Sequence, residues 1–105
     1  MNVMISDRHG NPIQLIRLGY DSYEFIMDRI ESSDDFPIFN GVLKDFYGED
    51  QVWLNQLQTF KKEVSHFKQL YEPSFPLYTA EFFTDLDQLM ENAINSNNTI
   101  KFVGD

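Results

Sequence analysis

The chain has 105 residues, of which 42% are hydrophobic, and it carries 17 acidic against 8 basic side chains and no cysteine. This length fits a single domain, residues 1–105, that can bury a core without disulfides. The formal charge of -9 argues against direct nucleic-acid binding, which needs clustered Lys and Arg. With neither a secretory signal nor a membrane-length apolar segment in view, we expect a cytoplasmic protein.

Two short apolar runs rich in β-branched residues come first in the chain, Asn2 to Ser6 and Ile13 to Leu18. Between them, Asp7 to Pro12 is a dense cluster of turn-forming residues. An apolar pair of segments joined by such a cluster is typical of a β-hairpin.

A first helix is predicted from Asp21 to about Ser32. Asp21 is expected to cap the free amides of its first turn, with Glu24 completing a capping box. Tyr20 and Phe25 are expected to form a hydrophobic staple around the same turn. Residues at helical spacing give this helix an apolar face; they are Tyr23, Ile26, Met27 and Ile30.

The segment from Phe36 to Tyr47 is rich in aromatic residues but has no clean period. Pro37 disfavours a helix that continues from the preceding one, so we expect at most a short strand around Ile38 to Leu43. After this segment, Glu49 or Asp50 is expected to cap the next helix with a negative charge at its positive end.

The strongest pattern in the chain runs from Trp53 to Tyr71. Its large apolar residues recur at steps of 4, 3, 4, 3 and 4, which places all of them on one stripe of a helix. These residues are Trp53, Leu57, Phe60, Val64, Phe67 and Tyr71. Polar residues separate them, so we expect a long amphipathic helix with its apolar stripe in the core.

Two prolines, Pro73 and Pro76, cannot continue the hydrogen bonding of this helix and end it. A third helix is predicted to begin between Thr79 and Asp85, with Thr84 or Asp85 as its cap. It is expected to end at Asn95 to Asn98, since asparagine tolerates the left-handed turn that closes helices.

The run from Thr99 to Val103 predicts a last strand, added to the N-terminal hairpin. The predicted fold class is therefore α+β. A small antiparallel sheet, made of the N-terminal hairpin plus the C-terminal strand, packs against about three helices.

No group of residues predicts catalysis, a metal or a cofactor. His9 falls in the predicted turn and His66 on the polar flank of the central helix, and neither has a second metal ligand at useful spacing. The carboxylates from Asp45 to Asp50 lack the pattern of an EF-hand loop. We expect a protein that is not an enzyme; a small metal-dependent hydrolase is the rival interpretation, and it requires a carboxylate cluster that holds a metal.

The negative charge is concentrated between residues 21 and 50, which hold nine acids and two bases. The acids are Asp21, Glu24, Asp28, Glu31, Asp34, Asp35, Asp45, Glu49 and Asp50, and the bases are Arg29 and Lys44. Such a face either keeps the protein soluble or docks a basic protein.

Four aromatic residues lie in the same region, and they either fill the core or form an exposed anchor ringed by carboxylates. These four are Phe36, Phe39, Phe46 and Tyr47. The predicted partner-binding residues are Asp34, Asp35, Asp45, Phe46, Tyr47, Glu49 and Asp50.

Five segments of the chain carry a resemblance to a known family when they are taken in order: Leu18 to Phe25, Phe36 to Phe39, Asp45 to Glu49, Leu86 to Ile94 and Ile100 to Phe102. They resemble the immunity proteins of bacterial polymorphic-toxin systems, in particular the family catalogued as immunity protein seventy. The resemblance implies an antidote that binds a cognate toxin domain in the producing cell and blocks it.

Toxins of these systems are often basic nucleases, which an acidic antidote would reach quickly. The function expected from the sequence is therefore neutralisation of a cognate toxin domain by protein-protein contact, with no membrane or direct nucleic-acid binding. The alternative is an acidic adaptor or accessory subunit that binds another basic protein. The oligomeric state is left open.

Overall fold

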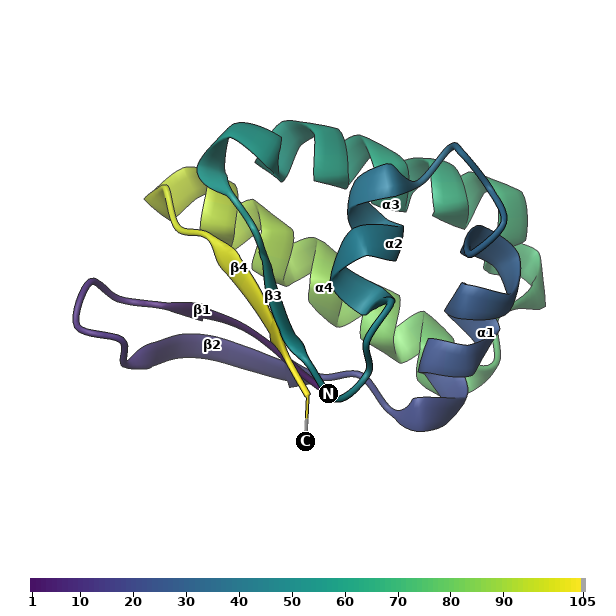
Figure 1. Cartoon of the computed structure of the whole chain (residues 1–105), viewed down its shortest axis with the longest axis horizontal. Coiled ribbons are helices and arrows are strands. Elements are labelled where there is room, and N and C mark those ends of the chain that lie inside the picture. The colour runs from purple at the N-terminus through teal and green to yellow at the C-terminus, as the bar shows by residue number, and fades with distance from the viewer. Residues whose placement is uncertain (105) are drawn as a thin grey trace.

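The structure, a computed structural model, describes residues 1–104. In this part of the chain one four-stranded sheet carries four α-helices on one of its sides (Figure 1). The elements are β1 (Asn2–Ser6), β2 (Pro12–Arg17), α1 (Tyr20–Ile30), α2 (Pro37–Leu43), β3 (Glu49–Val52), α3 (Leu57–Tyr71), α4 (Leu77–Ser96) and β4 (Ile100–Val103), with short 3-10 turns at Leu54–Gln56 and Glu72–Ser74. The predicted α+β class is confirmed.

The sheet has the strand order β2-β1-β4-β3, and every neighbouring pair is antiparallel. The hairpin and its pairing with the C-terminal strand are as predicted. β4 lies in the interior of the sheet, where Phe102 is opposite Val3 on one side and Asp50 on the other. Strand β3 was not predicted, since four residues that pair with a segment some fifty positions away leave no local pattern.

The turn between β1 and β2 is organised by the carboxylate of Asp7. Its Oδ1 accepts hydrogen bonds from the backbone N–H groups of His9 at 2.8 Å and Asn11 at 2.9 Å. The hydrogen bond from Asn11 is the main reason that the pKa of Asp7 lies below its ordinary value. Gly10 adopts a φ of 82°, a left-handed conformation that glycine takes without a steric penalty.

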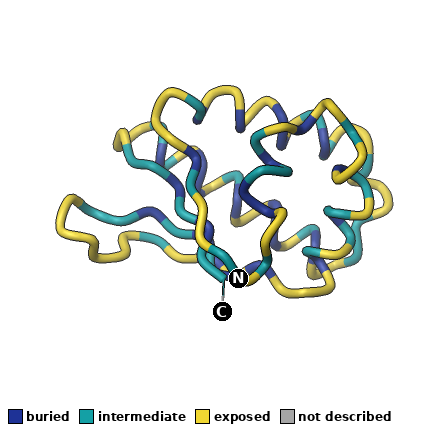
Figure 2. The backbone as a smooth tube through the Cα atoms, in the orientation of Figure 1, coloured by how far each residue is buried: buried dark blue, intermediate teal, exposed yellow. Residues whose placement is uncertain are grey.

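The core lies between the inner face of the sheet and the helices, where buried residues from both line up (Figure 2). Its centre is a set of phenylalanine rings around Phe39, which meets the rings of Phe60, Phe67 and Phe83 edge to face at centroid separations of 5.7, 5.9 and 6.3 Å. Phe36 and Phe39 are fully buried, so of the two alternatives for these aromatics they take the core.

The prediction of a strand around Ile38 to Leu43 is wrong, because this segment is helix α2. Pro37 occupies the first turn, where its missing N–H costs nothing. The N-terminal amides are capped from another helix: the buried carboxylate of Glu63, on α3, accepts from the N–H groups of Ile38 and Phe39, both at 3.0 Å. A cap that comes from 24 residues away is invisible to a local pattern, and the count of helices rises from three to four.

The long helix is confirmed from Leu57 to Tyr71, but its predicted first residue is wrong. Trp53 lies before the 3-10 turn and has 53% of its surface exposed, so it is not part of the core stripe. The next four apolar residues of the stripe are buried. The predicted cap at Glu49 or Asp50 is wrong as well, since both residues belong to β3.

The other helices also begin at unpredicted positions. The N-cap of α1 is Gly19, and no side chain of the described residues 1–104 caps the helix, so the capping box of Asp21 and Glu24 does not form. The predicted staple of Tyr20 and Phe25 does not form either. Tyr20 contacts the rings of Tyr23 and Phe46, whereas Phe25 contacts the ring of Phe75.

Helix α4 begins at Leu77, before the predicted range, so that Thr84 and Asp85 lie inside the helix rather than at its cap. Pro76 precedes the first turn, where proline is compatible with a helix start. The predicted end is confirmed, because Asn97 takes the left-handed conformation at φ 60°.

Candidate functional site

The outward face of α1, together with the residue that ends the helix, Glu31, carries a continuous stripe of carboxylates, here called the α1 acidic stripe. Its members recur at steps of 3, 4 and 3, and all are exposed; they are Asp21, Glu24, Asp28 and Glu31. The buried Ser22, Ile26 and Ile30 lie on the opposite side of the same helix. Burying the apolar residues therefore turns all four acids to solvent.

The one base on α1 does not neutralise this stripe. Arg29 donates from its Nη1 to the backbone oxygen of Phe25 at 2.9 Å, and its guanidinium carbon lies 3.6 Å from the centre of the Phe25 ring. It also lies over the ring of Tyr71, at 5.6 Å. The guanidinium is thus held on the aromatic side of the helix by cation-π contacts.

Beside the stripe lies a second group, here called the surface aromatic cluster, which joins α1 to the loop after α2. Phe46 is its centre and meets the rings of Tyr23, Tyr20 and Tyr47 at 4.6, 5.4 and 5.4 Å. Phe46 and Tyr23 are half-buried, whereas Tyr20 and Tyr47 are 54% and 74% exposed. The cluster therefore has an anchored inner half and an open outer half.

The loop that presents Tyr47 is fixed by its own hydrogen bonds and by the C-terminal segment. Asp45 accepts from the N–H of Tyr47 through its Oδ1 at 3.1 Å, and its backbone oxygen accepts from Gly48 N–H at 3.1 Å. Gly104 donates its N–H to the oxygen of Gly48 at 2.7 Å. A Cβ at Gly104 would overlap the backbone of Tyr47, so this close approach requires glycine.

Acids on both sides of the surface aromatic cluster affect the pKa of the Tyr23 hydroxyl. Burial is the main cause that raises the pKa of its hydroxyl, and the negative charges of Asp45 and Glu31 raise it further. Asp45 follows α2 and Glu31 follows α1, yet both act on the same hydroxyl. The field around the aromatic cluster is therefore negative on two sides.

The predicted partner-binding residues do not form a single cluster. Asp34 and Asp35 lie before α2, whereas Asp45, Phe46 and Tyr47 lie after it, so the helix separates the two groups. Among residues 1–104 no Lys or Arg is within ion-pair distance of any of these acids; Asp35 has only His66, with 4.0 Å between Oδ2 and Nε2.

The last two predicted residues, Glu49 and Asp50, lie on β3, the edge strand of the sheet. Asp50 Oδ1 accepts a hydrogen bond from the N–H of Gln51 at 2.8 Å. Two acids on a short edge strand, one of them bonded to a strand N–H, discourage pairing with another chain. We therefore assign these two residues to protection of the edge.

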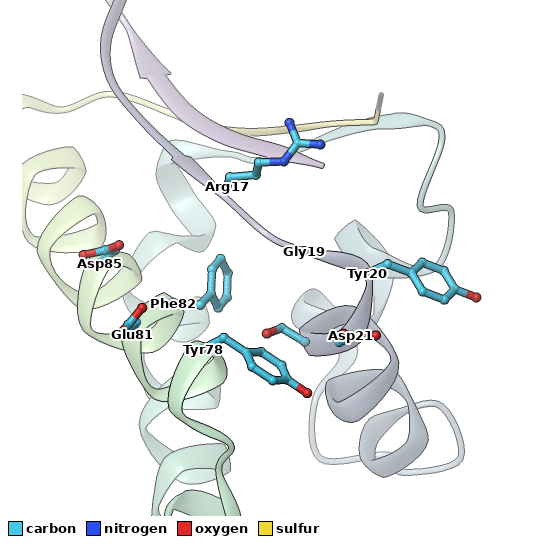
Figure 3. A pocket seen from close by; sticks show the side chains of 9 residues that line it. Arg17, Gly19, Tyr20, Asp21, Tyr78, Glu81, Phe82 and Asp85 are labelled. Carbon is cyan, nitrogen blue, oxygen red and sulfur yellow. The ribbon is translucent and has the colours of Figure 1, made fainter.

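A hollow of about 380 Å³ lies next to the stripe, between the end of β2, the start of α1 and the first half of α4; we call it the α1–α4 hollow (Figure 3). Its side chains from α4 are Tyr78, Glu81, Phe82 and Asp85. The two helices are tied together at its base, where the hydroxyls of Ser22 and Thr79 are buried and 3.0 Å apart.

Sequence reasoning missed this hollow because its carboxylates are spread over two helices far apart in the chain. It also placed Tyr20 and Tyr23 only as staple and core residues. The signal that pointed beyond packing was the spacing of Tyr20 and Tyr23, three residues apart and flanked by Asp21 and Glu24.

Within residues 1–104, no three His, Cys, Asp or Glu side chains are grouped so that they could hold a metal ion. In the same part of the chain, none of the helices has both the length and the apolar composition needed to cross a membrane.

Comparisons with family models, curated proteins and solved structures found no match to this chain. The resemblance to immunity proteins stays a prediction from the sequence.

Proposed function

We propose that the protein is an inhibitor that binds a basic protein, a bacterial toxin domain, through the α1 acidic stripe and the surface aromatic cluster. One observation carries the proposal: four exposed carboxylates run along α1 with no base of their own helix turned towards them. Beside them, Tyr47 extends 74% of its surface to solvent from a fixed turn.

The two parts of this surface have different physical roles. Exposed carboxylates of one sign attract a cationic partner over a distance and raise the rate of association, while they contribute little to affinity once salt screens them. Aromatic residues on a rigid support contribute affinity, because they lose little conformational entropy on binding and bury a large area. We expect the α1 acidic stripe to set the association rate and the surface aromatic cluster to set the dissociation rate.

The experiment mixes the purified protein with the protein encoded by the neighbouring gene and measures binding by calorimetry and stopped-flow at low and at moderate salt. We expect a one-to-one complex whose association rate falls steeply as salt rises. Absence of a complex at low salt contradicts the proposal.

A pair of charge-matched variants tests the location of the interface. Glu24→Gln with Asp28→Asn removes two charges from the stripe, and Glu72→Gln with Glu91→Gln removes two charges elsewhere. The stripe variant is expected to slow association about fivefold more than the control. Equal slowing by both variants would mean that net charge, and not this face, drives binding.

The same surface would serve an adaptor for another basic protein, and a growth assay separates the two functions. An inhibitor restores growth to cells that express the neighbouring gene. An adaptor forms the complex without restoring growth, and that outcome would replace the inhibitor by its alternative.

A further inference from the structure

We infer that the α1–α4 hollow receives an arginine side chain of the protein partner. The inference rests on the proposed function, because it names a contact within the same acidic surface. The hollow adjoins that surface directly: Asp21 belongs to the α1 acidic stripe and Tyr20 to the surface aromatic cluster, and both line the hollow. A partner that covers α1 therefore also covers the mouth of the hollow.

The charge of the lining selects a cation. Three carboxylates, those of Asp21, Glu81 and Asp85, face one base, Arg17. Glu81 and Asp85 are one turn apart and so lie on the same side of α4, and in Figure 3 both stand on the α4 wall while Arg17 projects away from that helix. An anion would meet these carboxylates with no compensating base on the α4 side.

The aromatic part of the lining favours a flat cation. Phe82 is 4% exposed and forms the apolar floor, while Tyr78 is 51% exposed and extends its ring from α4 towards α1 (Figure 3). A guanidinium stacks on such a ring and donates to carboxylates in pairs. The compact, strongly hydrated ammonium of lysine does neither as well.

The hollow is large enough for one arginine side chain. Its volume of about 380 Å³ lies in the lower part of the range of small-molecule pockets, so volume alone does not select the occupant. The aliphatic stem of an arginine would cover Phe82, and its head would reach the carboxylates at the rim. Because Asp21 and Tyr20 of the proposed interface also line the hollow, we assign it to a side chain of the protein partner, and a free polyamine is the competing occupant that the experiment has to separate.

The test is an NMR titration of the 15N-labelled full chain with acetylated and amidated tripeptides Gly-Arg-Gly, Gly-Lys-Gly and Gly-Gln-Gly, and separately with spermidine. We expect saturable shifts for the arginine peptide at the amides of residues 19–22 and 78–85. The lysine peptide should bind several-fold more weakly, and the glutamine peptide should cause no saturable shift.

Two double variants that remove the same charge test where the arginine peptide binds. Glu81→Gln with Asp85→Asn should weaken binding of the arginine peptide about fivefold, the effect expected of two partly exposed charge contacts. Glu72→Gln with Glu91→Gln removes the same charge outside both the hollow and the α1 acidic stripe and should leave the affinity nearly unchanged. Unaltered amide spectra away from the substitutions verify that both variants are folded.

Three outcomes overturn the inference: no saturable shift with the arginine peptide, equal weakening by both variants, or tighter binding of spermidine than of the arginine peptide. These outcomes are independent of the proposed function. If the protein encoded by the neighbouring gene forms a complex but the arginine peptide causes no saturable shift at the hollow, this inference alone is removed. If the arginine peptide binds at the hollow but no such complex forms, the proposed function is removed and the hollow remains an arginine site.

Discussion

Two groups of aromatic rings in this chain differ in what surrounds them. Around Phe39, the rings of Phe60, Phe67 and Phe83 are buried on all sides by helices and sheet. The surface aromatic cluster around Phe46 has similar ring separations, but one half of it is open to solvent and acids lie on its flanks. Rings of the same kind are thus enclosed in one place and partly open to solvent in the other.

The comparison predicts that substitutions in the two groups affect different properties. Phe39→Ala removes a fully buried ring at the centre of the first group and should lower the free energy of unfolding by about 3–5 kcal/mol. Urea denaturation followed by circular dichroism measures this loss. A loss no greater than that of an exposed residue would mean that the two groups do not differ in the way proposed.

Glu63→Ala tests how much the cap of helix α2 contributes to stability, because Glu63 caps the helix that carries Phe39. Two amides of α2, those of Ile38 and Phe39, lose their acceptor, and an unsatisfied buried donor costs about 1–3 kcal/mol. Glu63→Gln is the control, since the amide oxygen still accepts. Equal denaturation midpoints for the alanine and glutamine variants would show that the hydrogen bonds contribute nothing.

The ionisation of Glu63 makes this support depend on pH. Burial raises the pKa of its carboxyl above the ordinary 4.5, against the two backbone hydrogen bonds that lower it. The folded state therefore binds this proton more tightly than the unfolded state, and the contribution to stability falls as pH rises from about 4.5 through the raised pKa. Glu63→Gln lacks this titration, so the stability of the wild type relative to that variant should decline across the same window.

Tyr47→Ala is expected to have the smallest effect on stability, within about 0.5 kcal/mol, because its ring is largely exposed. Binding of the partner should weaken at least tenfold if Tyr47 is an anchor of the interface. Calorimetry with the neighbouring protein measures the affinity, and denaturation verifies that the fold is unchanged. Loss of stability together with unaltered binding would reverse the roles assigned to the two aromatic groups.

Local periodicity was sufficient to predict much of this fold. The stripe from Leu57 to Phe67 is buried as its spacing predicts, and the turn residues between Asp7 and Pro12 mark the hairpin. Asn97 ends α4 in the predicted left-handed conformation. In each case the residues that determine the structure are neighbours in the sequence.

The errors occurred where a distant residue supplies what the local sequence lacks. Helix α2 depends on Glu63 of α3 for its cap, and within residues 1–104 β3 pairs with β4 alone. The same reason limits how much of the site could be predicted. The sequence indicated the acids of residues 21–50, but not that Phe46 contacts Tyr20 and Tyr23. Contacts between segments, rather than composition, define the surface.

The interior position of β4 has a consequence for how the chain acquires its fold. Residues 100–103 pair with β1 on one side and β3 on the other, so during synthesis neither neighbour can complete its pairing until all four helices have already been made. Until that moment the nascent hairpin has a bare flank that is open to wrong partners. Folding should therefore be late and concerted, with residues from both ends of the described chain coming together in a single closing step.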